Sequence, residues 1–364
     1  MNRFSADRLA ARLNSYLVLW FALMVSASPS PATQVPCEGD FNGDGKVTVD
    51  ELVTAVNNAL YGCPTNIGAD QACTDLAAAH CAKLDQCVVN GTMIRYGQLA
   101  TCQSRLKQLC IVALGANGTG NTPDTQERCA LELPAVPCDS FDIRQGFICP
   151  PKAGTVPIGG ACAFDAQCVT STCAIATGTN CGTCAAPNQA GDSCASASCS
   201  LGFFCVDSTQ QCQLPVPNAA VCDSGHPCNV SLSCVIPNGM ISGTCEPAGE
   251  TSGAACDPTR QIAAGCNGNA GLYCNGTTKT CMPVTYATAS GQCGIVNHAV
   301  VDCINASTCF GAQGQTPGTC IADALEGTPC DTVAGPSCLL PARCVNGSGA
   351  TAGICRLPDP TVCE

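Results

Sequence analysis

The chain has 364 residues and a formal net charge of −12, and 36 of its residues are cysteine. An acidic chain with few lysines and arginines is poorly suited to binding nucleic acid or an anionic membrane. This much cysteine predicts a disulfide scaffold in an oxidising compartment. The alternative interpretation of so many cysteines is metal binding by their thiolates. It is disfavoured because the chain has only three histidines and few Cys-x2-Cys pairs.

Residues 1–27 have the pattern of a secretory signal peptide. Three arginines precede the apolar run 17–25, small residues follow it, and cleavage is expected after Ala27. A membrane anchor is disfavoured because the run is short for a bilayer, and no later stretch is apolar enough to span one. Cleavage lowers the net charge to −14, since three arginines and one aspartate leave with the peptide. We therefore expect a secreted or cell-surface protein, whose mature chain begins with a proline-rich linker, residues 28–36.

Residues 40–51 have the spacing of a twelve-residue calcium loop. Ca²⁺ binds roughly six to eight oxygen atoms, and Gly45 stands where the loop must turn sharply. The predicted ligands, at loop positions one, three, five, seven, nine and twelve, are Asp40, Asn42, Asp44, the backbone carbonyl of Lys46, Thr48 (directly or through water) and Glu51. A plain Asn/Gly/Asp turn without an ion is the alternative, but it needs no such alternation of acids. Leu52, Val56 and Leu60 are expected to share one face of a following helix.

This loop resembles an EF-hand and, more closely, the loop-and-helix half of a dockerin repeat, over residues 38–62. The resemblance implies Ca²⁺ as the cofactor, held by the residues named above. A dockerin has two such repeats and usually an aspartate at the twelfth position, whereas this chain has one repeat and Glu51. Cys37 and Cys63 bracket the motif. We expect them to clip its ends, which makes residues 37–64 a separate unit.

Residues 65–150 are predicted to be a cysteine-rich helical domain. Apolar residues recur there at helical spacing. Thr122 and Pro123 have the pattern of an N-cap and first position of a helix. The prediction is three or four short helices joined by about four disulfides, with a flexible Gly/Asn loop at 115–121. The eight cysteines are Cys73, Cys81, Cys87, Cys102, Cys110, Cys129, Cys138 and Cys149, and two pairs among them (73/81 and 102/110) are eight residues apart, on one helix face.

Residues 159–364 contain six tandem repeats with four cysteines each. A turn of small residues precedes the first cysteine, and Gly-Thr often precedes the fourth. We expect each repeat to form a small hairpin with a small core, and neighbours to stack into an elongated array. The first cysteines are Cys162, Cys194, Cys222, Cys256, Cys293 and Cys330, and the fourth are Cys184, Cys212, Cys245, Cys281, Cys320 and Cys355.

The disulfide pairing within a repeat is open from sequence, because four cysteines allow three connectivities. We favour first-to-third and second-to-fourth. Cys181 and Cys363 fall outside the frame. They could bond to each other or to cysteines elsewhere. Cys181 and Cys184 have the spacing of a redox pair, but the strand-to-helix context of such a pair is missing.

The frame of the repeats resembles the N-terminal cysteine-rich module of Dickkopf and the EGF-like and EB modules. This resemblance implies short two-stranded modules with an extracellular binding or spacer role. The fold class we predict is thus a small disulfide-rich multi-module protein, with a helical segment followed by tandem β/loop modules. The whole layout is similar to that of secreted proteins of soil bacteria.

The function we expect is that of a calcium-binding structural or protein-interaction protein without catalytic activity. Its partner would be an extracellular protein or part of a cell envelope. Histidine, tryptophan, lysine and arginine are too scarce to indicate a catalytic pocket. The alternative is a secreted hydrolase or hydrolase inhibitor with its site in the helical segment or a repeat loop. Paired carboxylates in a pocket of the helical segment would favour that alternative.

Overall fold

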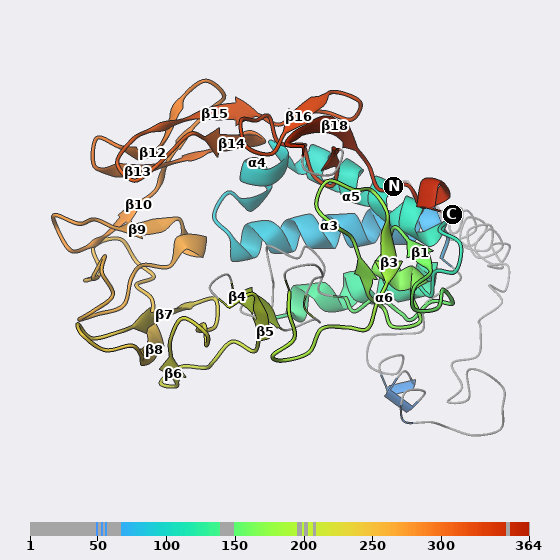
Figure 1. The fold of residues 1–364 in the computed structure, drawn as a ribbon, viewed down its shortest axis with the longest axis horizontal. Coiled ribbons are helices and arrows are strands. Elements are labelled where there is room, and N and C mark those ends of the chain that lie inside the picture. Colours follow the sequence, from blue (N-terminus) through green and yellow to red (C-terminus); the bar gives the residue numbers. More distant parts are fainter. Residues whose placement is uncertain are drawn as a thin grey trace, which may run out of the picture. The chain divides into compact units, whose positions relative to one another are not determined.

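The chain divides into two compact units, Met1–Asn66 and Ile67–Glu364. The computed structural model describes residues 49, 52–53, 55–56, 67–138, 149–194, 199, 203–206, 209–346 and 350–363. The predicted signal peptide and linker lie outside these residues. The second unit contains a helical segment followed by several small antiparallel β modules (Figure 1), as the sequence predicts. Within the described ranges, no helix combines the length and apolarity needed to cross a membrane.

Four α-helices lie in the described part of the helical segment, residues 67–138 and 149–150. They are α3 (Ala69–Cys87), α4 (Gly91–Tyr96), α5 (Leu99–Leu114) and α6 (Pro123–Glu132), followed by the 3-10 turn η1 (Leu133–Ala135). The predicted start of α6 is confirmed, because the Thr122 hydroxyl accepts a hydrogen bond from the Thr125 amide and Pro123 takes the first position. Helices α3 and α5 are longer than the short helices that the sequence predicts.

Two disulfides tie α3 to α5, two helical turns apart. Cys73 bonds to Cys110 and Cys81 bonds to Cys102, so the two helices run antiparallel. The eight-residue spacing on each helix therefore serves to bring both pairs to one interface. The remaining two disulfides of the segment, Cys87–Cys138 and Cys129–Cys149, secure α6 and the chain that follows it. The expectation of about four disulfides is confirmed.

The six repeats form six β modules, numbered here in chain order. In every module the first cysteine bonds to the third and the second to the fourth, which confirms the favoured pairing. Each core consists largely of the module's own cysteines, as in the cluster of Cys162, Cys168, Cys173 and Cys184. The strands are β1 (Ala161–Cys162), β2 (Cys173–Ala174), β3 (Gly182–Cys184), β4 (Phe204–Val206), β5 (Gln211–Gln213), β6 (Val221–Cys222), β7 (Leu232–Val235), β8 (Gly243–Pro247), β9 (Leu272–Cys274), β10 (Cys281–Pro283), β11 (Thr285–Ala287), β12 (Gln292–Val296), β13 (Ala299–Cys303), β14 (Ser307–Phe310), β15 (Gly318–Ala322), β16 (Pro329–Asp331), β17 (Arg343–Val345) and β18 (Ala352–Arg356).

The small-residue turn before each first cysteine has one backbone conformation in all six modules. The residue three positions before that cysteine has a positive φ, and its amide donates to the carbonyl of the fourth cysteine. Glycine adopts a positive φ at no steric cost, whereas other residues are strained there. The six residues are Gly159, Gly191, Ala219, Gly253, Ser290 and Gly327.

A glycine two residues before the fourth cysteine marks the modules in which the strand of that cysteine lies between two other strands. In module 3, Gly243 of β8 pairs with Cys222 of β6, and a Cβ on it would lie 1.9 Å from the Val235 carbonyl oxygen of β7. Only glycine fits between two such closely approaching strands. The same contact recurs at Gly182, Gly318 and Gly353. Modules 2 and 4 carry Gln210 and Lys279 there, both with a positive φ, and form two-stranded sheets.

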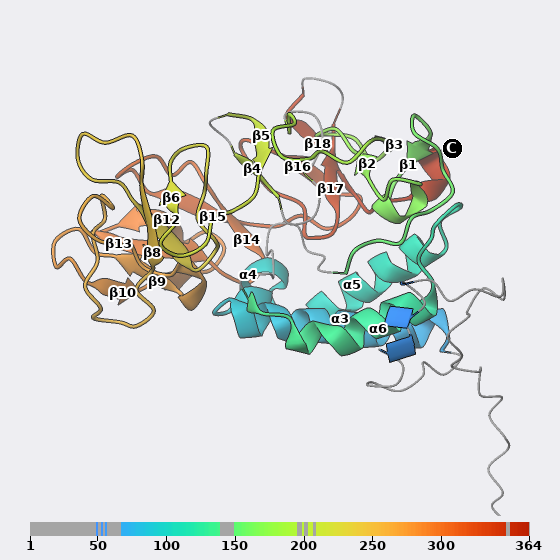
Figure 2. The same ribbon diagram turned by 90° about the horizontal axis from the view of Figure 1, so that it is seen from below.

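The six modules do not continue in one direction, so the expectation of an elongated array is wrong. Cys181 of module 1 bonds to Cys363, across a sequence separation of 182 residues, so the last module returns to the first. In both ribbon views the C-terminal turn η5 (Pro360–Cys363) lies beside β1 and β3 (Figures 1 and 2). The helical segment offers the modules a surface to fold back on, which stacking between neighbours alone does not supply.

The loop at 115–121, which we expected to be a flexible connector, bonds to the chain around module 1. The Thr155 amide donates to the Gly118 carbonyl, and the Gly120 amide donates to the Ala166 carbonyl. The side chain of Gln167 donates to the Asn117 carbonyl. The loop therefore fixes module 1 to the end of the helical segment.

Candidate functional site

All six predicted calcium ligands lie outside the described residues. They are Asp40, Asn42, Asp44, Lys46, Thr48 and Glu51. The bracketing cysteines Cys37 and Cys63 lie outside them too. The calcium site therefore remains a prediction of the sequence, and the structure tests neither its ligands nor its ion.

The predicted helix after the loop is present where the structure describes it. Val49, Leu52, Val53, Ala55 and Val56 are helical. The four branched side chains at positions 49, 52, 53 and 56 have helical spacing and are each about half exposed or more. The first unit thus presents apolar side chains on one stripe of a helix.

The sulfur atoms of each module lie close together, but they are not metal ligands. Those of Cys162, Cys168 and Cys184, for example, are within 4.8 Å of one another. Metal binding needs thiolates, and each of these sulfurs is in a disulfide. No free cysteine occurs within the described ranges. Cys181 and Cys184 bond to different partners, so they form no redox pair.

Arg105 of α5 clamps module 6 to the helical segment. Its guanidinium forms an ion pair with Glu326 and donates to the backbone carbonyls of Leu339, at 2.8 Å, and Leu340. The arginine is 8 % exposed. Its hydrogen bonds hold the pKa of Glu326 below the usual range. No sequence pattern indicates this contact, because the partners are more than 200 residues apart.

Modules 4 and 5 dock on the helices through main-chain hydrogen bonds. The Val89 amide, after α3, donates to the Asn269 carbonyl of module 4 at 2.9 Å. The Asn305 amide of module 5 donates to the Met93 carbonyl of α4 at 2.9 Å. Modules 1, 4, 5 and 6 are thereby all fixed to the helical segment.

Two titratable groups of the helical segment, His80 and Glu127, have shifted pKa values that bear on a catalytic role. Burial, with a smaller contribution from the charge of Arg95, lowers the pKa of His80 to about 4, so its ring is neutral at neutral pH. The carboxyl groups of Glu127 on α6 and Asp75 on α3 lie together. Burial raises the pKa of Glu127, and the charge and hydrogen bond of Asp75 raise it further. The alternative function, a hydrolase site in the helical segment, would draw on this carboxyl pair.

Two adjoining loops at the junction of modules 3 and 4 hold bulky apolar side chains in solvent. Ile241, between β7 and β8, is 91 % exposed, and Ile262 of module 4 is 90 % exposed. The Ile236 amide donates to the Arg260 carbonyl, which joins the loops. The Asp257 carboxylate accepts hydrogen bonds from the amides of Thr259, Gln261 and Ile262. The loop that presents Ile262 is therefore fixed from within.

Comparisons with protein-family models, with curated proteins and with solved structures give no match to this chain. What the structure establishes is the class: a cysteine-rich, multi-module disulfide protein with a helical segment followed by small β modules. The resemblances to dockerin and to Dickkopf rest on the sequence patterns alone.

Proposed function

We propose that this is a secreted, disulfide-stabilised, calcium-binding protein with a structural or protein-interaction role and no catalytic activity. The extensive disulfides support an oxidising, extracellular location. The acidic net charge of the chain favours a protein or cell-envelope partner over nucleic acid.

The observation that carries the interaction role is the exposure of Ile241 and Ile262 on loops held in place by hydrogen bonds. Exposed bulky apolar groups in a fixed conformation are what binding anchors require, because little conformational entropy is then lost on association. The disulfides of modules 3 and 4 add to this rigidity. A single exposed aliphatic side chain on a mobile loop would not indicate a binding site.

The calcium role rests on the loop at residues 40–51. The bound ion would order the loop and start the helix that carries Val49, Leu52, Val53 and Val56. Their apolar stripe is a second surface on which a partner could act. In this proposal calcium controls the order of the first unit, while the disulfides keep the second unit folded without metal.

A hydrolase is the second candidate, and the Asp75–Glu127 pair is the observation in its favour. A shared proton between two carboxyl groups is a known arrangement for acid–base catalysis. The pair is also a common way to accommodate two acids between packed helices. The Gln71 side chain donates to the Asp75 carboxylate at 2.8 Å. This is a side-chain pair one turn apart within α3, of the kind that stabilises ordinary helices.

We expect Asp44→Ala to abolish the stabilisation of the first unit by calcium. The substitution removes the carboxylate at the fifth loop position, where Ca²⁺ needs a charged oxygen ligand. The measurement is hydrogen exchange of peptides from residues 38–62, with calcium and with a chelator. In the unsubstituted protein, calcium should slow this exchange, and in the variant it should not.

Asp50→Ala is the matched control, because it removes an acid of the same loop at a position that supplies no ligand. It should keep the response to calcium. Identical exchange of the unsubstituted protein with calcium and with chelator would refute the calcium site. An equal loss of response in both variants would show that the loop acts only as a diffuse acidic patch.

A further inference from the structure

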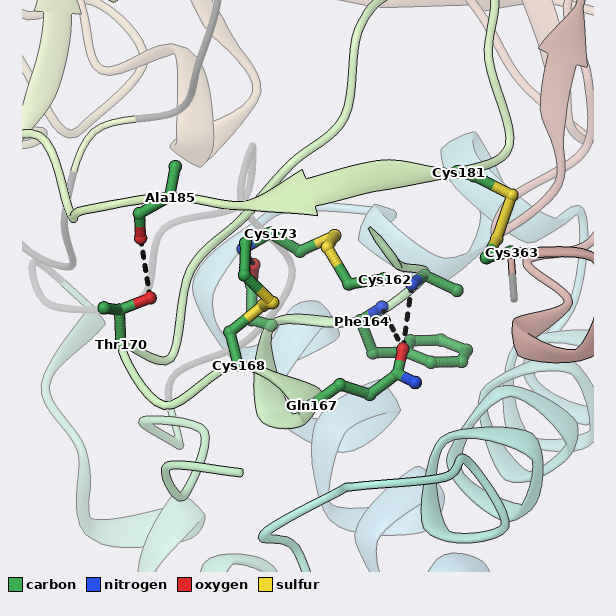
Figure 3. Close-up of a disulfide and its surroundings, with 12 residues drawn as sticks. Cys162, Phe164, Gln167, Cys168, Thr170, Cys173, Cys181, Ala185 and Cys363 are labelled. Carbon is green, nitrogen blue, oxygen red and sulfur yellow. Dashed lines mark hydrogen bonds between the residues drawn. A yellow bond between two sulfur atoms is a disulfide. The ribbon is translucent and has the colours of Figure 1, made fainter. Parts of the chain in front are cut away.

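The contact between the first and last modules is a seam held by one disulfide. We define the seam as residues 177–181 of module 1 with Asn346 and residues 357–363. The Asn180 side chain donates to the Leu357 carbonyl at 3.1 Å, and the Asn346 amide donates to the Gly178 carbonyl at 3.0 Å. Figure 3 shows Cys181, at the start of β3, joined to Cys363 on the C-terminal turn. The turn η5 also contacts β1, an edge strand of its sheet.

Without the disulfide the seam is weakly held, because polar groups are buried in and beside it without partners. The side-chain oxygen of Asn180, which is 8 % exposed, has no hydrogen-bond partner within the protein. One terminal nitrogen of Arg343, on β17 of module 6, is likewise buried and unpaired. Each such group costs free energy relative to water. The attraction between Arg343 and Asp165 of module 1, together with the two hydrogen bonds named above, offsets this cost across the two modules.

The disulfides within the modules differ from Cys181–Cys363 in how closely their two cysteines are held together. Each module has two interlocked disulfides whose partners are between 11 and 18 residues apart and whose strands are hydrogen bonded. A broken module disulfide therefore keeps its two thiols close together, and it re-forms readily. Cys181 and Cys363 are 182 residues apart. Once their bond opens, the seam contacts and the separate attachment of modules 1 and 6 to the helical segment keep the two thiols near each other, and no second disulfide of the described residues joins these two modules.

We propose that Cys181–Cys363 is a redox latch, which an external dithiol opens before the disulfides of the modules. One thiolate of the dithiol attacks the sulfur of Cys181, and the Cys363 thiolate leaves and takes up a proton. The second thiol of the reagent then attacks its own half of the mixed disulfide and releases Cys181 as a thiol. Two electrons and two protons pass to the protein, and the dithiol becomes a disulfide.

Opening the latch frees the strap formed by residues 357–363 from module 1. The strap then no longer contacts β1, an edge strand of its sheet. Module 6 stays in place, because Arg105 and Glu326 hold it independently of the latch. The change is local, and it does not depend on calcium binding or on the proposed partner.

The test is graded reduction of the full chain with dithiothreitol, followed by alkylation and mass spectrometry of every cysteine. We expect Cys181 and Cys363 to be alkylated about tenfold faster than the module cysteines, since their bond re-forms least readily. Earlier or simultaneous reduction of the module pairs would overturn the proposal.

A double variant, Cys181→Ser with Cys363→Ser, gives a second readout that needs no reductant. Hydrogen exchange should rise in residues 177–181 and 357–363 and stay unchanged in modules 2 to 5. The matched control is Cys256→Ser with Cys274→Ser, which removes a module disulfide and should raise exchange throughout module 4. Unchanged exchange at the seam, or a rise across all modules, in the latch variant would contradict the latch.

Discussion

Arg105→Ala is expected to lower the free energy of unfolding of the second unit by about 3 kcal/mol, because it leaves partly buried partners of an ion pair unsatisfied. The lost guanidinium serves Glu326 and the carbonyls of Leu339 and Leu340 together. Module 6 should then detach from α5. Chemical denaturation followed by far-ultraviolet circular dichroism reports the helices, and hydrogen exchange of residues 324–345 reports the module.

Lys107→Ala on the same helix is the control for this prediction. Lys107 forms an ion pair with Asp70 at 2.8 Å, but the Asp70 side chain is 79 % exposed. Its loss should cost less than about 0.5 kcal/mol, because solvent screens exposed pairs. Equal effects of the two substitutions would show that Arg105 is an ordinary surface residue and not a clamp.

Gly243→Ala should destabilise module 3 by about 2 kcal/mol, in the range for forcing an extra group into a packed site. The added methyl group would lie 1.9 Å from the Val235 carbonyl oxygen, so β8 must move away from β7. We expect faster hydrogen exchange at the amides of Val235 and Thr244, which are paired across β7 and β8.

Gly268→Ala is the matched control, since nothing lies within 4 Å of a Cβ placed there. It should leave exchange in its own module 4 unchanged. If Gly243→Ala were equally silent, the explanation of the Gly-Thr-Cys pattern by close strand approach would be wrong.

The local rules of the modules could be predicted from the sequence, because they act over short distances. The repeated cysteine positions indicated six modules, and the short step from second to third cysteine favoured the pairing that is found. The small residues before each first cysteine mark a positive φ, as at Gly191, and the glycine before the fourth marks a close strand contact, as at Gly243. Both glycine positions could have been interpreted this way from the sequence.

The arrangement of the modules could not be predicted, because it depends on contacts between distant residues. A repeat predicts how neighbours stack, and stacking alone led us to expect an elongated array. The return of the array depends on Cys181 with Cys363 and on Arg105 with Glu326. No local sequence pattern around these residues indicates that their partners are so distant in the chain. The sequence leaves open whether Cys181 and Cys363 bond to each other or to other cysteines, because both fall outside the repeated frame.

The predicted calcium site, unlike the fold, is supported by the sequence pattern alone. Its residues, Asp40 to Glu51, form a pattern that is local and chemically specific. Leu52 and Val56, which follow the predicted loop, are helical as expected. The ligand geometry itself still has to be tested by the calcium experiment with Asp44→Ala.

One disulfide frame builds all six modules, and one additional disulfide, Cys181–Cys363, joins the last module to the first. Peptide mapping of the unreduced protein by mass spectrometry tests this arrangement most directly. We predict first-to-third and second-to-fourth bonds in every module, as in Cys222–Cys234 and Cys228–Cys245, together with Cys181–Cys363. Free thiols in the modules, a different pairing, or a bond from Cys363 to another cysteine would contradict it.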